Sequence, residues 1–382
     1  MISDGGGTPG AILRSPTFTF DVPDNLGSSS LAFGSYAAAL GNHSLAGGLY
    51  TTASGSRAFA FGEGSSDNRT EATGDVSIAM GKHVKATNIG SIALGADTWS
   101  TGKYSLAIGR ADVDFDLSGN LIFYGAKGNY SAGIGENVKA IGNYSLAFGQ
   151  NTEANGNYSL AFGQNATTSN DGNIAIGINA KASSDDTIAL GNGAKATVSG
   201  AIAIGHNTKA NSPYTIAIGN NSNANKSYAV AIGCDNTASA AGAFALGYGT
   251  TAGGKYSTTL GQYTSTAAEG ALAFGNHTKA NATSNSGAYN SLVGGYYSES
   301  SHNATIVVGN QLRSANINGA VFGQYNSIEG LGATANDRAL LILGNGSSDS
   351  ARSNAFVVLR DGRMILGSGS HGTALPASGY EG

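Results

Sequence analysis

This 382-residue sequence contains only one cysteine, five prolines and one tryptophan. The lone Cys234 excludes an intrachain disulfide. So little proline excludes collagen, which also needs glycine at every third position. Charged residues make up only 12% of the chain, and 20 basic residues nearly balance 24 acidic ones. This balance gives no electrostatic footprint for nucleic acid.

Two further absences narrow the class of protein. No apolar run approaches the roughly 18 residues of a membrane-spanning helix, so we expect no membrane insertion. The N-terminus has no basic region followed by an apolar one, so we expect no secretory signal. Disorder is also disfavoured, because 41% of the residues are hydrophobic and the net charge is only −4.

Glycine, in contrast, is abundant at 59 residues, and many glycines end a recurring tetrapeptide of the form apolar-Ala-apolar-Gly. Successive tetrapeptides follow a 14-residue lattice, which three insertions interrupt, after Gly62, Gly109 and Gly275. This lattice predicts 20 repeat units. Its glycines are Gly34, Gly48, Gly62, Gly81, Gly95, Gly109, Gly135, Gly149, Gly163, Gly177, Gly191, Gly205, Gly219, Gly233, Gly247, Gly261, Gly275, Gly295, Gly309 and Gly323.

The residues just before each glycine predict a β-strand. Large apolar residues stand one and three positions ahead of it, as in Leu146 and Phe148, in Ile202 and Ile204, and in Ile216 and Ile218. A period of two is typical of a strand with one buried face, and we expect these large residues to form that face. The small residue between them, such as Ala147, then lies on the opposite face, where it indicates a second close contact such as a neighbouring chain.

The second half of each unit reads N-x-T-x-A, and we expect a shorter, more polar strand there. Segments such as Asn155-Gly156-Asn157 have the chemistry of turns, since Gly and Asn tolerate positive φ. Each 14-residue repeat is therefore one turn of a β-solenoid. Because a 14-residue turn encloses little apolar volume, we expect stability to need partner chains.

These repeats resemble a known family. Residues 143–149 (Asn-Tyr-Ser-Leu-Ala-Phe-Gly) and 186–191 (Asp-Thr-Ile-Ala-Leu-Gly) are similar to the repeats of YadA-like heads of trimeric autotransporter adhesins, and the resemblance spans residues 28–330. It implies an all-β, left-handed parallel β-roll. It also implies a homotrimer whose alanine-bearing faces lie near the subunit contacts.

Within the C-terminal part, residues 331–382, the segments 339–346 and 352–366 resemble a segment of bacteriophage tail-fibre and related virion proteins. Two short strands are expected at 356–359 and 363–366, joined by a hairpin turn at Asp361-Gly362. Such a β cap would cover the last turn of the solenoid. Residues 1–27 are interpreted as an N-terminal attachment segment.

The largest insertion, about residues 110–127, is expected to form a projecting hairpin. Asp112, Asp114 and Asp116 alternate with apolar residues and share one face, which is either simply solvated or a cation site. The EF-hand pattern fails, because its glycine and glutamate positions carry Leu117 and Phe123. The hairpin, with Phe115, Phe123 and Tyr124 beside the aspartates, is a candidate contact surface; a clasp between subunits is the alternative.

A column of tyrosines precedes the lattice glycines by five positions. Two interpretations stay open: a sugar-binding aromatic column, with Tyr144 and Tyr158 as candidate contacts, or turn residues that stack on one another. The column comprises Tyr104, Tyr130, Tyr144, Tyr158, Tyr214, Tyr228 and Tyr256.

No catalytic constellation, cofactor motif or metal-ligand spacing is present, and the six histidines are scattered. We therefore expect a structural protein without enzymatic activity, cofactor or metal. Its primary interpretation is a homotrimeric head or tail fibre of a bacteriophage virion. The expected partners are a capsid or tail protein, bound through residues 1–27, and a host-surface glycan or protein. The alternative is a bacterial cell-surface adhesin head that binds matrix or glycans.

Overall fold

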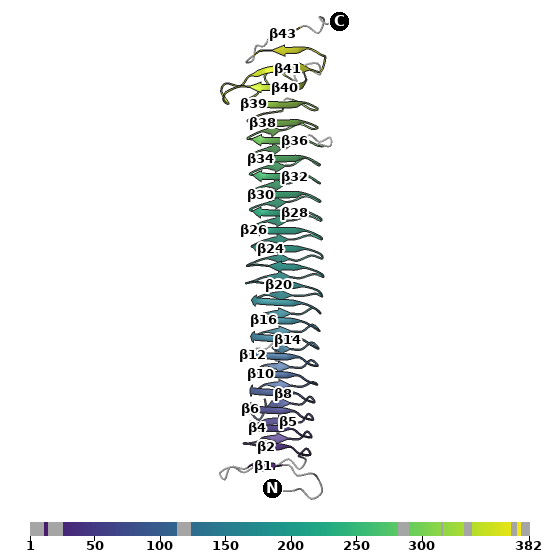
Figure 1. Cartoon of the computed structure of the whole chain (residues 1–382), viewed down its shortest axis with the longest axis vertical. Helices are drawn as coiled ribbons and strands as arrows, with labels where there is room; N and C mark the ends of the chain where they lie inside the picture. Colours follow the sequence, from purple (N-terminus) through teal and green to yellow (C-terminus); the bar gives the residue numbers. More distant parts are fainter. Residues whose placement is uncertain are drawn as a thin grey trace. The chain divides into compact units, whose positions relative to one another are not determined.

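A computed structural model describes residues 11–13, 26–112, 124–281, 290–314, 316–331, 338–367 and 373–375. The chain divides into two compact units, Met1–Ala196 and Thr197–Gly382. Within the described ranges the regular structure is all β-strand, and no helix there is long and apolar enough to cross a membrane. Each unit is a parallel β-solenoid (Figure 1), which confirms the predicted fold class, while its left-handed winding and trimeric state stay predictions.

The first unit alternates long and short strands. Its longer strands pair in parallel and are β1 (Ala11–Leu13), β2 (Leu31–Phe33), β4 (Leu45–Leu49), β6 (Phe59–Glu63), β8 (Ile78–Lys82), β10 (Ile92–Ala96), β12 (Leu106–Arg110), β14 (Ala132–Glu136), β16 (Leu146–Gln150), β18 (Leu160–Gln164), β20 (Ile174–Ile176) and β22 (Ile188–Leu190). The shorter strands form a second parallel ladder and are β3 (Ala38–Ala39), β5 (Thr51–Ala53), β7 (Thr70–Ala72), β9 (Lys85–Ala86), β11 (Trp99–Ser100), β13 (Gly125–Ala126), β15 (Lys139–Ala140), β17 (Glu153–Ala154), β19 (Thr167–Thr168), β21 (Lys181–Ala182) and β23 (Lys195–Ala196).

The second unit repeats this plan and ends in antiparallel strands. Its longer strands are β24 (Ile202–His206), β26 (Ile216–Asn220), β28 (Val230–Cys234), β30 (Phe244–Tyr248), β32 (Thr258–Gln262), β34 (Leu272–Asn276), β36 (Leu292–Tyr296), β38 (Ile306–Asn310), β39 (Ala320–Gln324) and β40 (Ala339–Asn345). The shorter strands are β25 (Lys209–Ala210), β27 (Asn223–Ala224), β29 (Thr237–Ala238), β31 (Thr251–Ala252), β33 (Ser265–Thr266), β35 (Lys279–Ala280) and β37 (Glu299–Ser300). The last strands are β41 (Asn354–Leu359), β42 (Met364–Leu366) and β43 (Thr373–Leu375).

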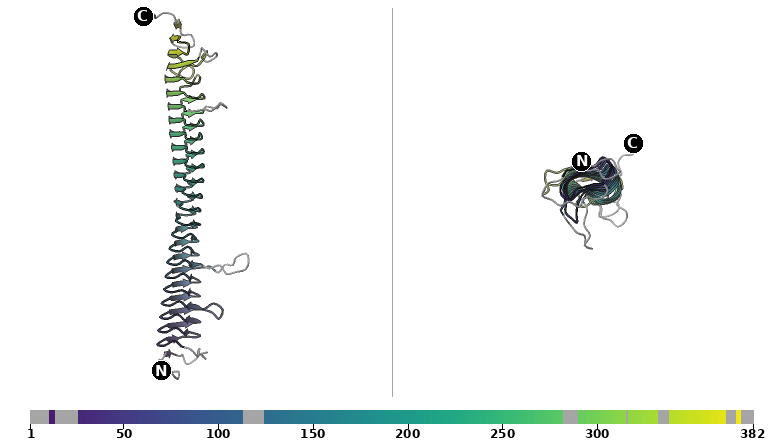
Figure 2. Two further views of the ribbon diagram at one scale, coloured as in Figure 1. Left: turned by 90° about the vertical axis from the view of Figure 1, so that its right-hand side faces the viewer. Right: turned by 90° about the horizontal axis from the view of Figure 1, so that it is seen from below.

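Within each unit the 14-residue lattice is the strand register. Gly149 pairs with Gly163, and Gly205 pairs with Gly219. Insertions leave the register intact, because Gly62 pairs directly with Gly81 across the first of them. That insertion follows β6 and projects as a loop (Figure 2, left, purple).

The two faces of the long strands are the reverse of the expectation from sequence. Ala147 and Ala161 are fully buried inside the turn, whereas Leu146, Phe148 and Phe162 point outward and are 37%, 40% and 45% exposed. The repeat residues Ile202, Ile204, Ile216 and Ile218 likewise flank buried alanines and are only half-buried. A 14-residue turn is too narrow to enclose large side chains, so alanine fills the interior. The alanine-bearing faces therefore lie in the core of each chain, and the prediction that they approach subunit contacts is wrong.

The corners of the turn also differ from the prediction. Positive φ occurs at Asn151 (52°) and Tyr158 (55°), seven positions apart, rather than at Gly156. Gly156 is needed for a different reason, because a Cβ there would lie 1.8 Å from the carbonyl oxygen of Asn170 in the next turn. Gly156 thus permits close stacking, while Asn151 and Tyr158 adopt the left-handed conformation.

The lattice glycines have both a positive φ and a close approach to the backbone of the next turn. Gly149 has φ +135°, and a Cβ on it would lie 1.8 Å from the carbonyl oxygen of Gly163. The other repeat glycines also have positive φ: Gly163 133°, Gly177 131°, Gly191 124°, Gly205 121° and Gly219 116°. Only glycine satisfies both the backbone angle and the close approach at these positions.

Buried hydroxyls account for the remaining fixed positions of the repeat. The Thr152 Oγ1 donates to the carbonyl oxygen of Gly163 (2.8 Å), and the Ser145 Oγ donates to that of Gly142 (2.6 Å). These bonds tie the buried Thr152 and Ser145 side chains to backbone carbonyl oxygens, so a hydroxyl is accommodated at both inward positions.

The second unit closes with a broader core. Strand β40 continues the parallel register, with Gly344 opposite Gly323. Strand β41 pairs antiparallel with β40, and β42 pairs antiparallel with β41. The hairpin predicted around Asp361-Gly362 is present. Val357 and Leu359 of β41 join a buried cluster with Leu312 and Ile342, side chains that the alanine-lined turns do not accommodate.

Candidate binding surfaces

Three outward surfaces stand out on the turns, and the first is the apolar face of the long strands. Leu146 pairs with Leu160 and Phe148 with Phe162, and the two phenylalanine rings stack with centroids 4.9 Å apart. The same positions are partly exposed in successive turns of each unit. Monomeric soluble proteins rarely expose apolar patches larger than a few hundred Å². This face is therefore a candidate contact surface.

The second surface is the tyrosine column. Tyr130, Tyr144 and Tyr158 stack with centroids 5.0 and 5.1 Å apart and nearly parallel planes. Each tyrosine occupies a left-handed corner and is more than half exposed. The prediction that stacked turns align these residues is confirmed, and the ring faces are largely used against one another. Sugar binding by Tyr144 and Tyr158 stays a prediction.

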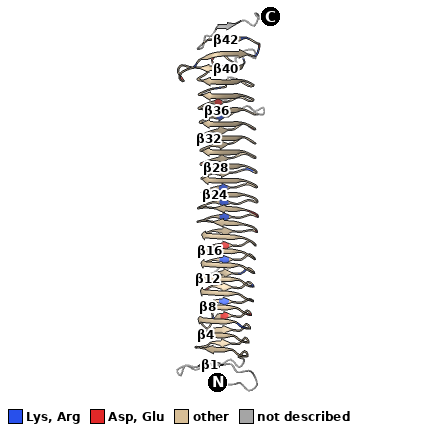
Figure 3. Cartoon of the chain, viewed as in Figure 1, with Lys and Arg blue, Asp and Glu red and all other residues tan. Residues whose placement is uncertain are grey.

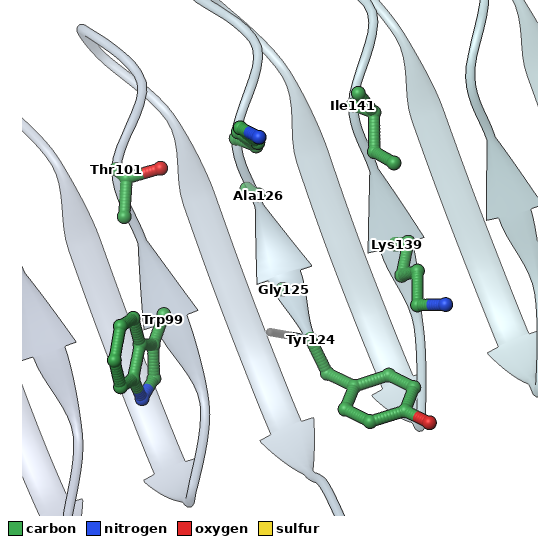
Figure 4. Close-up of a pocket in the computed structure, with 8 residues that line it drawn as sticks. Trp99, Thr101, Tyr124, Gly125, Ala126, Lys139 and Ile141 are labelled. Carbon is green, nitrogen blue, oxygen red and sulfur yellow. The ribbon is translucent and has the colours of Figure 1, made fainter. Parts of the chain in front are cut away.

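The third surface is a pocket of about 440 Å³ on the outer side of the short strands of the first unit. Trp99 of β11 and Tyr124, just before β13, lie on either side of Gly125 (Figure 4). The lining residues are Trp99, Thr101, Tyr124, Gly125, Ala126, Lys127, Lys139 and Ile141.

Register explains why a pocket exists at this turn. Trp99, Gly125 and Lys139 are aligned in neighbouring short strands, each at the outward position. Gly125 has no side chain to fill the space between its neighbours. It also has φ +127°, and a Cβ would lie 2.0 Å from the carbonyl oxygen of Trp99, so the backbone itself requires glycine here.

Charge around the pocket is largely paired. The Lys85 Nζ lies 4.7 Å from the centroid of the Trp99 ring and 3.6 Å from the Glu71 carboxylate. The Lys139 Nζ lies 5.1 Å from the Tyr124 centroid and 2.8 Å from the Glu153 carboxylate. Charged residues recur at this outward position in other short strands, such as Lys181 and Lys195 (Figure 3).

The predicted acidic face is described only at Asp112. Its carboxylate accepts hydrogen bonds from the Arg110 Nη2 (3.2 Å) and the Asn137 Nδ2 (2.8 Å). Asp114, Phe115, Asp116 and Phe123 lie outside the described residues, so the candidate cation site and contact surface of this insertion stay predictions. In the ranges that the structure describes, no group of three His, Cys, Asp or Glu side chains is placed to hold a metal.

Among the groups with a shifted pKa in the described residues are Cys234 and His302. Cys234 is half-buried, and its pKa is raised because the thiol donates a hydrogen bond to the Asp235 carboxylate (3.2 Å). Burial lowers the pKa of His302, whose Nδ1 lies 2.9 Å from the Ser314 Oγ.

Comparison with known families agrees with this geometry. The turns match the YadA head domain repeat (2 copies). The match covers residues 26–51, 86–110, 126–152, 140–166, 174–194, 196–222, 210–233, 224–250 and 238–264. YadA head repeats thus recur in both units, while β40 to β43 lie outside the matched segments. A comparison with curated proteins found no match.

The pocket is the site that sequence reasoning missed. Trp99 is the only tryptophan of the chain, which is a signal, but an insertion separates it from Gly125 along the sequence. Leaving that insertion out of the count brings Trp99, Gly125 and Lys139 into one column, an alignment that the sequence already contains.

Proposed function

We propose that this protein is a structural, homotrimeric, adhesin-like fibre that attaches to surface material through the outer faces of its turns. The match to the YadA head domain repeat carries the proposal. YadA-like heads belong to adhesins of bacterial cell surfaces, so a bacterial surface is the location that the match favours.

The outward apolar face supports the trimer. Leu146, Phe148 and Phe162 remain more than one-third exposed in the single chain. Each fully covered side chain of this size contributes about 1.5–3 kcal/mol. Because these residues recur every 14 positions, the surface that covers them best has the same period, and another copy of this chain has it.

The second candidate is a virion fibre. Its support is the resemblance of the C-terminal segment to phage fibre proteins, together with the antiparallel β41–β42 hairpin, which differs from the parallel turns of the repeat lattice. In that setting residues 1–27 would attach the fibre to a capsid or tail protein. Neighbouring capsid genes would favour the virion, whereas a reading frame that continues into a membrane anchor would favour the adhesin.

Assembly is tested by light scattering and sedimentation of the whole chain at micromolar concentration. We expect a trimer, and a stably folded monomer would refute the architecture. The double variant Phe148→Ser, Phe162→Ser should weaken assembly at least tenfold, because both rings leave the apolar face. The matched control Tyr158→Ser changes an exposed ring at a corner beside the same strands and should leave assembly unchanged.

Attachment is tested separately, with the assembled wild-type chain on bacterial cells, host matrix proteins and immobilised glycans. Binding to at least one surface that saturates with protein concentration is the expected result. A correctly assembled trimer that binds none of them would contradict the adhesive function while leaving the fold and assembly intact.

A further inference from the structure

The pocket above Gly125 has a geometry suited to a specific kind of ligand. We propose that it binds a single pyranose ring of a surface polysaccharide, an inference that rests on the proposed adhesive function and names its ligand class. The pyranose ring has an apolar C–H face and a polar hydroxyl rim, and the pocket offers a complementary surface for each.

An aromatic wall supplies the apolar surface. Strand β11 lies between β9 and β13 in the short-strand ladder. The Lys85 Nζ from β9 lies over one face of the Trp99 ring, at 4.7 Å. The opposite face of that ring is therefore directed along the ladder toward Gly125. Tyr124 adds a second ring across the gap (Figure 4).

The size of the gap limits what it holds. Trp99 and Lys139 bound it on the two sides, and they lie two strand spacings apart, about 9.6 Å. After the thickness of the side chains is subtracted, one six-membered ring fits between them. The volume of about 440 Å³ lies within the usual range of small-ligand pockets.

Polar groups at the edge of the pocket complement the hydroxyl groups of the sugar. The Thr101 hydroxyl and the Lys139 ammonium line the pocket, and Lys139 is held in place by Glu153 at 2.8 Å. Lys127 is exposed at the mouth, and the ion pairs among the described residues do not include it. A carboxylate on the sugar, as in a uronic acid, would pair with Lys127, so acidic pyranoses should bind more tightly than neutral ones.

A peptide ligand fits the same surface less well. The backbone N–H groups of Trp99 and Gly125 donate to the carbonyl oxygens of Tyr124 and Val138, and that of Lys127 donates to Ala140. With these groups paired within the ladder, an added peptide strand finds no backbone partners. A polyproline segment would need a groove longer than the single turn between Trp99 and Lys139.

The position of the pocket is compatible with assembly. Alanines of the long and the short strands face each other inside the turn, as Ala140 and Ala147 do. The outer side of the short strands therefore points away from the outer side of the long strands. A pocket on the former remains open to solvent when copies of the chain cover the apolar face of the latter.

Trp99 makes the proposal directly measurable, because it is the only tryptophan and its fluorescence reports on this pocket alone. The assembled full chain is titrated with tetragalacturonate as the acidic probe and with cellotetraose and chitotetraose as neutral probes. We expect a saturable change in emission, with at least a fivefold lower Kd for the acidic probe at low salt. Tyr124→Ala should raise the Kd about tenfold or more, and Lys127→Ala should remove the preference for the acidic probe.

Tyr36→Ala serves as the matched control, since it removes an exposed tyrosine of the same unit outside the pocket and should leave the titration unchanged. Each variant is checked for assembly, and Lys127→Ala, a change at an exposed side chain, keeps the test decisive if Tyr124→Ala fails to fold. No emission change with any sugar, in a chain that still attaches to surfaces, would overturn this inference but not the adhesive function. A proline-rich peptide that changes Trp99 emission where the sugars do not would overturn it as well. If the correctly assembled wild-type chain attached to no surface at all, the result would instead contradict the proposed function.

Discussion

Replacing the lattice glycine Gly149 with alanine should destabilise the solenoid by at least about 2–4 kcal/mol. Its φ of +135° is nearly exclusive to glycine, and forcing another residue into such a region costs about 1–3 kcal/mol. The added Cβ would also lie 1.8 Å from the Gly163 oxygen, so β16 and β18 would have to separate locally. That movement would break the 2.8 Å hydrogen bond from Thr152 to the same oxygen, at a further cost of about 1 kcal/mol.

The control is Gly362→Ala, in the C-terminal hairpin. Gly362 also has positive φ, +88°, but a Cβ there meets nothing within 4 Å. It therefore isolates the backbone penalty, about 1–2 kcal/mol, from the steric one. Urea unfolding at one fixed protein concentration gives both values, and amide exchange over Leu160–Gln164 locates the damage. Equal destabilisation by the two substitutions would refute the argument that the close approach of the turns, rather than φ alone, selects glycine.

Three further predictions follow from the turns. Ala161→Leu should lower the unfolding free energy by about 1–3 kcal/mol or more in thermal and urea scans, because Ala161 is fully buried in a filled interior; tolerance of leucine there would contradict the assigned inner face. Tyr144→Ala should cost about 1 kcal/mol by removing two stacked contacts, while Tyr144→Phe retains them; equal losses in the two variants would contradict a stacking role. Because burial lowers the pKa of His302 in the folded state, the stability it contributes is complete above its unfolded pKa of about 6.5 and is lost as pH falls through the folded pKa; His302→Asn should flatten the acid side of a Tm–pH profile, and an unchanged acid side would contradict this prediction.

The fold was largely predictable because its rule is a spacing along the chain. A constant 14-residue step places Gly149 beside Gly163 without any knowledge of distant contacts. The same spacing aligned Tyr144 with Tyr158. Insertions did not disturb the prediction, since they leave the lattice at a corner and return to the same register.

The orientation of the strands was not predictable from alternation alone. A period of two separates Ala161 from Phe162 but does not say which faces inward. Side-chain volume decides which face is buried. Because a 14-residue turn has room for alanine inside, Phe162 points outward. The same argument reverses the expected place of any subunit contact from the alanine face to the large apolar face.

Predicting the pocket would have required knowing which side chains lie next to one another in neighbouring turns. Its floor is an absent side chain, at Gly125, and its walls come from turns separated by an insertion. Gly125 looks like any other glycine in a glycine-rich sequence until its column neighbours, Trp99 and Lys139, are known.

The alanine-lined interior has a consequence for how such a protein can change. Along a long strand, alternate positions have different constraints. The inward position of Ala147 and Ala161 holds small side chains, with Thr259 and Val293 at the equivalent place in other turns, whereas the neighbouring outward residues are restrained only by what covers them. Stability and recognition therefore depend on different positions of the same repeat. A new surface chemistry can be introduced at any turn without redesigning its core, and whole 14-residue modules can be added or removed to lengthen or shorten the array of outward sites.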